Sequence, residues 1–80
     1  MEKQYAYIAR CIDGTIYVGC TNNLQRRIKD HNCGKVKSTA YRRPIKILSY
    51  LVFSEKHKAY FFEKYLKTVS GRAFLNKRLI

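Results

Sequence analysis

The dipeptide Asp13-Gly14 separates two short runs of aromatic and β-branched residues, and this feature constrains the fold more than any other. The runs are residues 4–12 (QYAYIARCI) and 15–20 (TIYVGC). Residues of these types favour strands, and Asp-Gly is a strong signal for the turn of a β-hairpin. Two antiparallel strands are therefore predicted here.

The hairpin admits two registers, which place its tyrosines differently. A three-residue loop over 12–14, with Gly14 in the left-handed conformation, puts Tyr7 and Tyr17 on the same face of the sheet. A two-residue turn at Asp13-Gly14 puts them on opposite faces. Each register leaves one reasonably apolar face, so the pattern leaves both open.

Capping residues and hydrophobic spacing predict the next elements. A helix follows the hairpin, with Thr21 or Asn22 as its N-cap and its end within 32–34. A basic loop over 34–44 (GKVKSTAYRRP) then leads into a third strand over 45–53 (IKILSYLVF).

The last part of the chain is predicted to be helical. Ser54 is expected to cap a long helix that runs to about Val69 and ends at Ser70-Gly71, with a short helix or tail over 72–80. The order β-β-α-β-α-α predicts an α+β fold in which helices flank a three-stranded antiparallel sheet. Eighty residues suffice for one core, so a single domain over 1–80 is expected.

The charge of the chain indicates a polyanionic partner. Seventeen Lys and Arg residues face five Asp and Glu residues, which gives a formal net charge of +12. Such a field attracts nucleic acid and speeds encounter with it. A solvated basic surface or affinity for a membrane surface is the alternative.

The sequence favours a reducing, intracellular environment. Its three cysteines form no CxxC pair, and their odd number argues against a disulfide framework. Residues 1–11 lack the apolar core of a signal peptide, and no apolar run is long enough to span a bilayer. We therefore expect a soluble, cytoplasmic protein.

The first predicted helix carries two polar residues on its inward face. Leu24, Arg27, Ile28 and His31 have the spacing of a core-facing stripe. The structural alternative is that Arg27 extends to solvent and His31 is a hydrogen-bonded core histidine. Two such residues beside a sheet edge favour a functional site.

Glu63 is the carboxylate that has no evident structural role. It lies between apolar neighbours on the long helix, whereas the other acids are accounted for by a terminus, a turn, an outward helix face or a helix end. The alternatives are a buried ion pair with Arg27 or an exposed pair with Lys67. One carboxylate predicts at most one divalent cation at this place, with water and phosphate oxygens completing its coordination.

These residues together resemble the GIY-YIG nuclease family, and in particular its small stand-alone bacterial members. Tyr5-Ala6-Tyr7 corresponds to the first half-motif, of which it keeps the final tyrosine, and Tyr17-Val18-Gly19 corresponds to the second. Arg27, His31 and Glu63 follow at the family's positions, and Asn76 is the most plausible match to a downstream asparagine. The resemblance spans Tyr5 to Asn76 and favours the three-residue hairpin loop.

The resemblance implies hydrolysis of a phosphodiester bond in nucleic acid. Tyr7 or Tyr17 would activate or position water, Arg27 would bind phosphate, and His31 would orient water or relay a proton. Glu63 would hold one Mg²⁺ or Mn²⁺, and Asn76 would add a polar contact.

Basic residues of the loop after the first helix are candidates for contacts to the nucleic-acid backbone, with a mobile, solvated charge cluster as the alternative. They are Lys35, Lys37, Arg42 and Arg43. Endonuclease activity in DNA repair or processing is the predicted function, with DNA favoured over RNA and a protein partner as a source of specificity. A non-catalytic DNA- or RNA-binding module and a protein-docking subunit are the alternatives. An outward-pointing Glu63 beside Lys67 would favour binding without cleavage.

Overall fold

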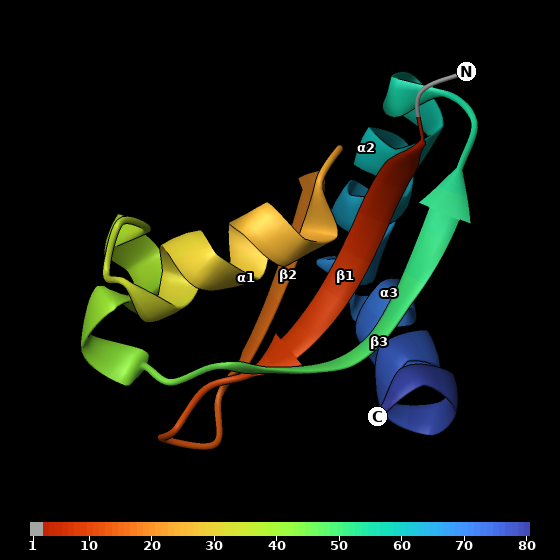
Figure 1. The fold of residues 1–80 in the computed structure, drawn as a ribbon. Helices are drawn as coiled ribbons and strands as arrows, with labels where there is room; N and C mark the ends of the chain where they lie inside the picture. The colour runs from red at the N-terminus through yellow and green to blue at the C-terminus, as the bar shows by residue number, and fades with distance from the viewer. Residues whose placement is uncertain (1–2) are drawn as a thin grey trace.

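The computed structural model describes residues 3–80 and contains a three-stranded antiparallel sheet flanked by helices (Figure 1). The strands lie in the order β2-β1-β3. In chain order the elements are β1 (Gln4–Arg10), β2 (Ile16–Thr21), α1 (Leu24–Asn32), the 3₁₀ helix η1 (Lys37–Arg42), β3 (Lys46–Phe53), α2 (Lys56–Leu66), α3 (Val69–Phe74) and the π-helical turn η2 (Leu75–Leu79). The predicted α+β fold is confirmed. Within the described residues, no helix is both long enough and apolar enough to cross a membrane.

The hairpin between β1 and β2 adopts the three-residue loop. The amide of Cys11 donates to the carbonyl of Thr15 at 2.8 Å, and Ala9 pairs with Tyr17. Gly14 has φ +86°, which L-residues with a side chain rarely adopt. This register puts Tyr7 and Tyr17 on the same face of the sheet, as the predicted three-residue loop requires.

The two faces of the sheet carry different packing. Ile8 and Val18 pack with Leu66 and Leu75, so α2 and the C-terminal turns cover one face. Ala9 and the neighbouring apolar residues form a second, smaller cluster. Figure 1 shows α1 and η1 on the other side of the sheet from α2 and α3. This arrangement brings α1 against the tyrosine face.

Helix α1 begins one or two residues later than predicted, because Asn23 is its N-cap. The Asn23 side chain accepts from the amide of Arg26 at 3.0 Å. Thr21 instead accepts from the amide of Asn23 at 3.1 Å, so its hydroxyl stabilises the turn before the helix. The predicted end of the helix within 32–34 is confirmed, since α1 ends at Asn32, shortly before Gly34, which has φ +84°.

The predicted long second helix is wrong, because the chain breaks it into α2 and α3. Glu55, not Ser54, is the N-cap of α2, and the helix ends at Leu66. The side chain of Thr68 then accepts from the amide of Gly71 at 3.0 Å and starts α3. Gly71 therefore lies inside a helix, and the N-cap preference of Thr68 outweighs the continuous apolar pattern.

Gly71 is required by the packing of α3 against the end of α2. A Cβ atom at this position would lie 1.7 Å from the carbonyl oxygen of Tyr65, which belongs to the backbone and has little room to move. We expect Gly71→Ala to lower the free energy of unfolding by about 1–3 kcal/mol, as overpacking usually does. Urea denaturation measures this change. Because alanine favours a helix more than glycine does, helix propensity alone predicts a gain in stability, so an unchanged or higher free energy of unfolding in Gly71→Ala would contradict the packing requirement.

Candidate active site

A chain of side-chain hydrogen bonds starts at Arg27 and ends inside the protein. Arg27 Nε lies 3.3 Å from the hydroxyl of Tyr7, and that hydroxyl lies 2.8 Å from His31 Nε2. His31 Nδ1 lies 2.7 Å from the hydroxyl of Thr39, which is 3.4 Å from the carbonyl of Val36. Tyr7, His31 and Thr39 are fully buried, whereas Arg27 is half-buried. These hydrogen bonds therefore connect a buried base, His31, to a cation near the surface, Arg27.

Elementary chemistry sets the direction of each bond. The guanidinium can only donate, so the Tyr7 oxygen accepts from Arg27 and the Tyr7 hydroxyl donates to His31 Nε2. The proton of neutral His31 is then on Nδ1 and is donated to Thr39, whose own hydroxyl donates to Val36. With these directions, each side chain of the hydrogen-bonded chain has a partner for its donor or acceptor. Neutral His31 is placed to take the proton of Tyr7.

The electrostatics keep both members of this pair neutral. Burial raises the pKa of Tyr7 to about 12, although the hydrogen bond from Arg27 acts in the opposite direction. Burial lowers the pKa of His31 below its usual value, and the positive charge of Arg27 lowers it further. Tyr7 therefore holds its proton at neutral pH, and His31 is free to accept one.

Gly19 leaves room for the Tyr7 side chain to cross β2. Tyr7 and Gly19 are paired across the strands, and a Cβ atom on Gly19 would lie 2.6 Å from the Tyr7 hydroxyl. The ring of Tyr17 lies beside both, with its centroid 6.1 Å from that of Tyr7 and 5.0 Å from that of His31. The glycine of the second half-motif thus has a steric role in the site.

Glu63 reaches the same region from α2. Its carboxylate raises the pKa of Tyr7, and after burial it is the next cause that raises the pKa of the Cys20 thiol to about 12. It also forms an ion pair with Lys67 at 2.7 Å. The Glu63 side chain is 18% exposed and that of Lys67 is 56% exposed, so the carboxylate lies in a recess beside a more exposed cation.

Comparison with known proteins identifies this arrangement. A model described as the GIY-YIG catalytic domain matches residues 3–78. The chain belongs to the GIY-YIG family. It is 42% identical over 73 residues to UPF0213 proteins of Streptococcus pyogenes serotypes M3 and M1, which covers 90% of this chain and 79% of each relative. The solution structure of a UPF0213 protein from Bacillus halodurans is similar, with a TM-score of 0.58 and 33% identity over 94% of this chain and 83% of that one.

Membership of the GIY-YIG family makes this a nuclease-type domain, and such nucleases typically use a divalent metal. The residues fit a cation held by one protein ligand. Glu63 supplies hard carboxylate oxygens, as Mg²⁺ prefers. Over residues 3–80 no three His, Cys, Asp or Glu side chains gather in one place, so water and phosphate oxygens would have to complete the coordination.

The other candidate residues of this GIY-YIG domain are not drawn into the hydrogen-bonded chain. Asn76 is exposed in η2, and among the described residues its side chain makes no hydrogen bond. Lys35 lies before η1 and Lys37 begins it, and both are exposed. Arg42 donates to the carbonyl of Ser38 at 3.0 Å and to the hydroxyl of Thr15 at 2.7 Å, which gives it a structural role.

Arg43 and Thr39 show what lies in the loop after α1. The Arg43 guanidinium rests over Gly34, where a Cβ atom would meet it at 2.5 Å. Thr39 was not predicted as a site residue, because the loop was expected to be irregular and basic, whereas η1 carries Thr39 inward to His31. A small polar residue eight positions after a core histidine was the only signal in the sequence.

The lowered pKa of His31 makes stability depend on pH. Below about pH 6.5 the unfolded chain binds a proton at this residue that the folded chain resists, so stability is retained above that pH and falls as the pH decreases. Urea denaturation at pH values on either side of the ordinary histidine pKa, about 6.5, measures the effect. His57→Ala, at the exposed second histidine, should leave the pH dependence unchanged. A pH dependence that disappears in this control would attribute it to His57.

Proposed function

We propose that this chain is a metal-dependent endonuclease-type phosphodiesterase, that residues 1–80 act as one catalytic unit, and that DNA is favoured over RNA as its substrate. The observation that carries the proposal is the directed hydrogen-bond chain from Arg27 through Tyr7 to neutral His31. A purely structural cluster does not need an arginine bound to a phenol whose proton points at a base. The net charge of +12 supports a nucleic-acid substrate.

In the proposed reaction, a water oxygen attacks phosphorus and the bond to the leaving oxygen breaks. Arg27 turns onto the phosphate and stabilises the negative charge that develops there. This movement opens the Tyr7 oxygen, which takes the proton of the attacking water while Tyr7 passes its own proton to His31 Nε2. The leaving oxygen takes a proton from solvent. Tyr17 beside Tyr7 helps to position the water.

Glu63 is the residue that would hold Mg²⁺ or Mn²⁺. A divalent cation, when bound, offsets charge on the phosphate and on the leaving oxygen. Lys67 would move from Glu63 to make the carboxylate available. Asn76 is proposed as a polar contact to the substrate, and Lys35, Lys37, Arg42 and Arg43 as contacts to the nucleic-acid backbone, with Arg42 the weakest because it already bonds within the protein.

The biological setting follows from the same reasoning. We infer a cytoplasmic enzyme of DNA repair or processing, with a protein partner that supplies specificity. A non-catalytic DNA- or RNA-binding module is the second candidate function. The ion pair between Glu63 and Lys67 favours it, because a paired carboxylate is less available to a cation.

A nicking assay tests the proposal. Supercoiled plasmid and single-stranded oligonucleotides are incubated with the protein in Mg²⁺, Mn²⁺ or EDTA. Cutting with metal that stops in EDTA, and that falls in a parallel Arg27→Ala preparation, supports the enzyme and excludes a contaminating nuclease. Binding to the same substrates without cutting in any of these conditions would support the second candidate.

A further inference from the structure

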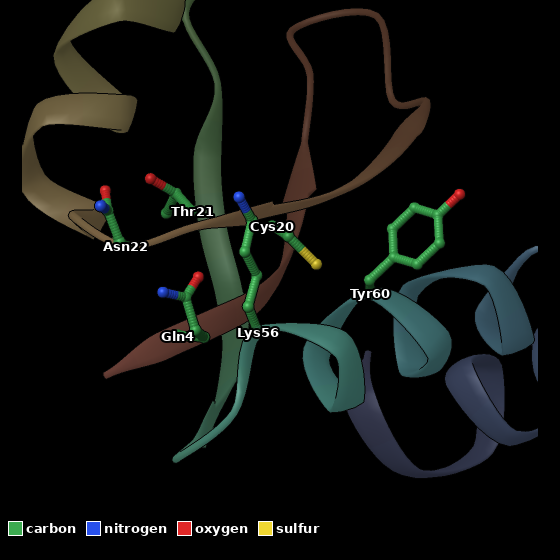
Figure 2. Close-up of a pocket in the computed structure, with 6 residues that line it drawn as sticks. All are labelled: Gln4, Cys20, Thr21, Asn22, Lys56 and Tyr60. Atoms are coloured by element: carbon green, nitrogen blue, oxygen red, sulfur yellow. The ribbon is translucent and has the colours of Figure 1, made fainter. Parts of the chain in front are cut away.

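A pocket of about 330 Å³ lies beside the candidate active site (Figure 2). It is formed by the ends of β1 and β2 and by the first turns of α2. Its lining residues are Gln4, Cys20, Thr21, Asn22, Lys56 and Tyr60. Cys20 joins the pocket to the site, because its thiol donates to the carbonyl of Ala59 at 3.2 Å and lies against Glu63. The volume is within the range of small-molecule sites, about 300–1,000 Å³.

Gln4 is the unusual member of this pocket. Its side chain is a neutral amide that lines the pocket, although the residue as a whole is only 7% exposed. Figure 2 shows the Gln4 amide on the same side of Lys56 as Thr21 and Asn22. An amide at the wall of a pocket can bind water or the polar atoms of a ligand. Its donors and acceptor match the edge of a nucleobase.

The remaining walls suit the flat part of the same ligand. Tyr60 is 48% exposed and lies on the far side of Lys56 from Gln4, as Figure 2 shows. Aromatic side chains commonly stack on bases that have left a duplex. Lys56 provides one positive charge for a phosphate, which is too little for a site built to bind an anion alone.

We propose that this pocket takes one unpaired nucleobase of the strand whose neighbouring phosphate lies at Arg27 and Glu63. The inference rests on the proposed nucleic-acid function and names its substrate class. A base within a duplex is stacked and paired, so it must be exposed before it enters. The preferred substrate is therefore single-stranded or locally opened nucleic acid.

The test compares two fluorescent oligonucleotides of equal length by anisotropy in EDTA. One carries bases and the other is abasic throughout, so the phosphate charge is the same and the electrostatic attraction is matched. Wild-type protein is expected to bind the base-bearing strand on the order of tenfold more tightly. Tyr60→Ala and Gln4→Met, which keeps the size of the side chain but not its amide, should lose this preference and bind the abasic strand as before.

Phe61→Ala is the matched control, because Phe61 is next to Tyr60, 64% exposed and outside the pocket lining. It should keep the preference for bases. Equal binding of both strands by the wild type, an unchanged preference in Tyr60→Ala, or an equal loss in Phe61→Ala would overturn the inference. Thermal melting checks that Gln4→Met folds. If Gln4→Met does not fold, the binding result for Tyr60→Ala alone tests the inference. Binding is measured in EDTA, so it does not depend on cutting. A protein that prefers bases in EDTA but does not nick DNA with metal present would contradict the proposed enzyme and leave the inferred pocket standing.

Discussion

Glu63→Ala is expected to reduce nicking by roughly 10³-fold, because metal-ion catalysis contributes several kcal/mol to such reactions and each 1.4 kcal/mol is about tenfold in rate. The carboxylate lies in a recess near Tyr7 and Cys20, and no second acidic side chain joins it there among the described residues. Under the proposed mechanism, its loss removes the protein's ligand for the cation. Initial rates of plasmid nicking in Mg²⁺ measure the change.

Lys67→Ala separates the ligand from the ion pair. It breaks the bond at 2.7 Å but leaves the carboxylate, so nicking should be kept or increased. Lys67 is 56% exposed, and ion pairs with a partner at the surface contribute about 0.2–1 kcal/mol, so both variants should remain folded. Equal losses in the two variants would show that the pair matters instead of the metal ligand. Full activity in Glu63→Ala would remove Glu63 from the mechanism.

The fold was largely predictable where local chemistry and long-range packing agree. Asp13-Gly14 lies between strand-forming residues, and the left-handed Gly14 gives the loop that aligns Tyr7 with Tyr17. The inward stripe of α1 was also informative, since burial of His31 follows from its spacing with Leu24. These patterns repeat over several residues, so one exception does not alter the prediction.

Other features depend on a single contact and were not predictable in the same way. Thr68 ends the long apolar pattern because its hydroxyl caps α3, and a lone threonine in a helical pattern gives little warning of this. Thr39 becomes part of the site only because η1 turns inward. Gln4 looked like an ordinary strand residue, and its place in a pocket wall is evident only once residues of α2 complete the pocket.

The pairing of Glu63 is a compromise between the two arrangements that the sequence left open. The carboxylate neither meets Arg27 nor points fully to solvent, but lies in a recess with Lys67 over it. Helical spacing predicts that residues four positions apart can meet, and it also predicts an inward position for Glu63. Cys20 on β2, which is distant in sequence, lies against the same carboxylate.

Tyr7→Phe is expected to reduce nicking by about 10²–10⁴-fold, the usual contribution of positioned proton transfer. The change removes only the hydroxyl, which is the group that joins Arg27 to His31. The proton of the attacking water then has no path to His31, and the guanidinium loses its acceptor. Buried Nε2 is also left without a donor, so the free energy of unfolding should fall by about 1–3 kcal/mol. Rates are therefore compared well below the melting temperature of the variant.

Tyr17→Phe is the comparison that decides which tyrosine carries the proton. Tyr17 is half-buried beside the same histidine, and its hydroxyl faces Arg27, whose pKa it helps Tyr7 to raise, but it makes no hydrogen bond to His31. If the path runs through Tyr7, Tyr17→Phe should lose less activity and keep the rise in rate as the pH passes the lowered pKa of His31. If Tyr17→Phe is inactive and Tyr7→Phe still cuts, water is activated at Tyr17 and the buried chain serves only to hold Arg27. The two phenols differ in burial and in partners, and this difference is what makes the pair of variants decisive.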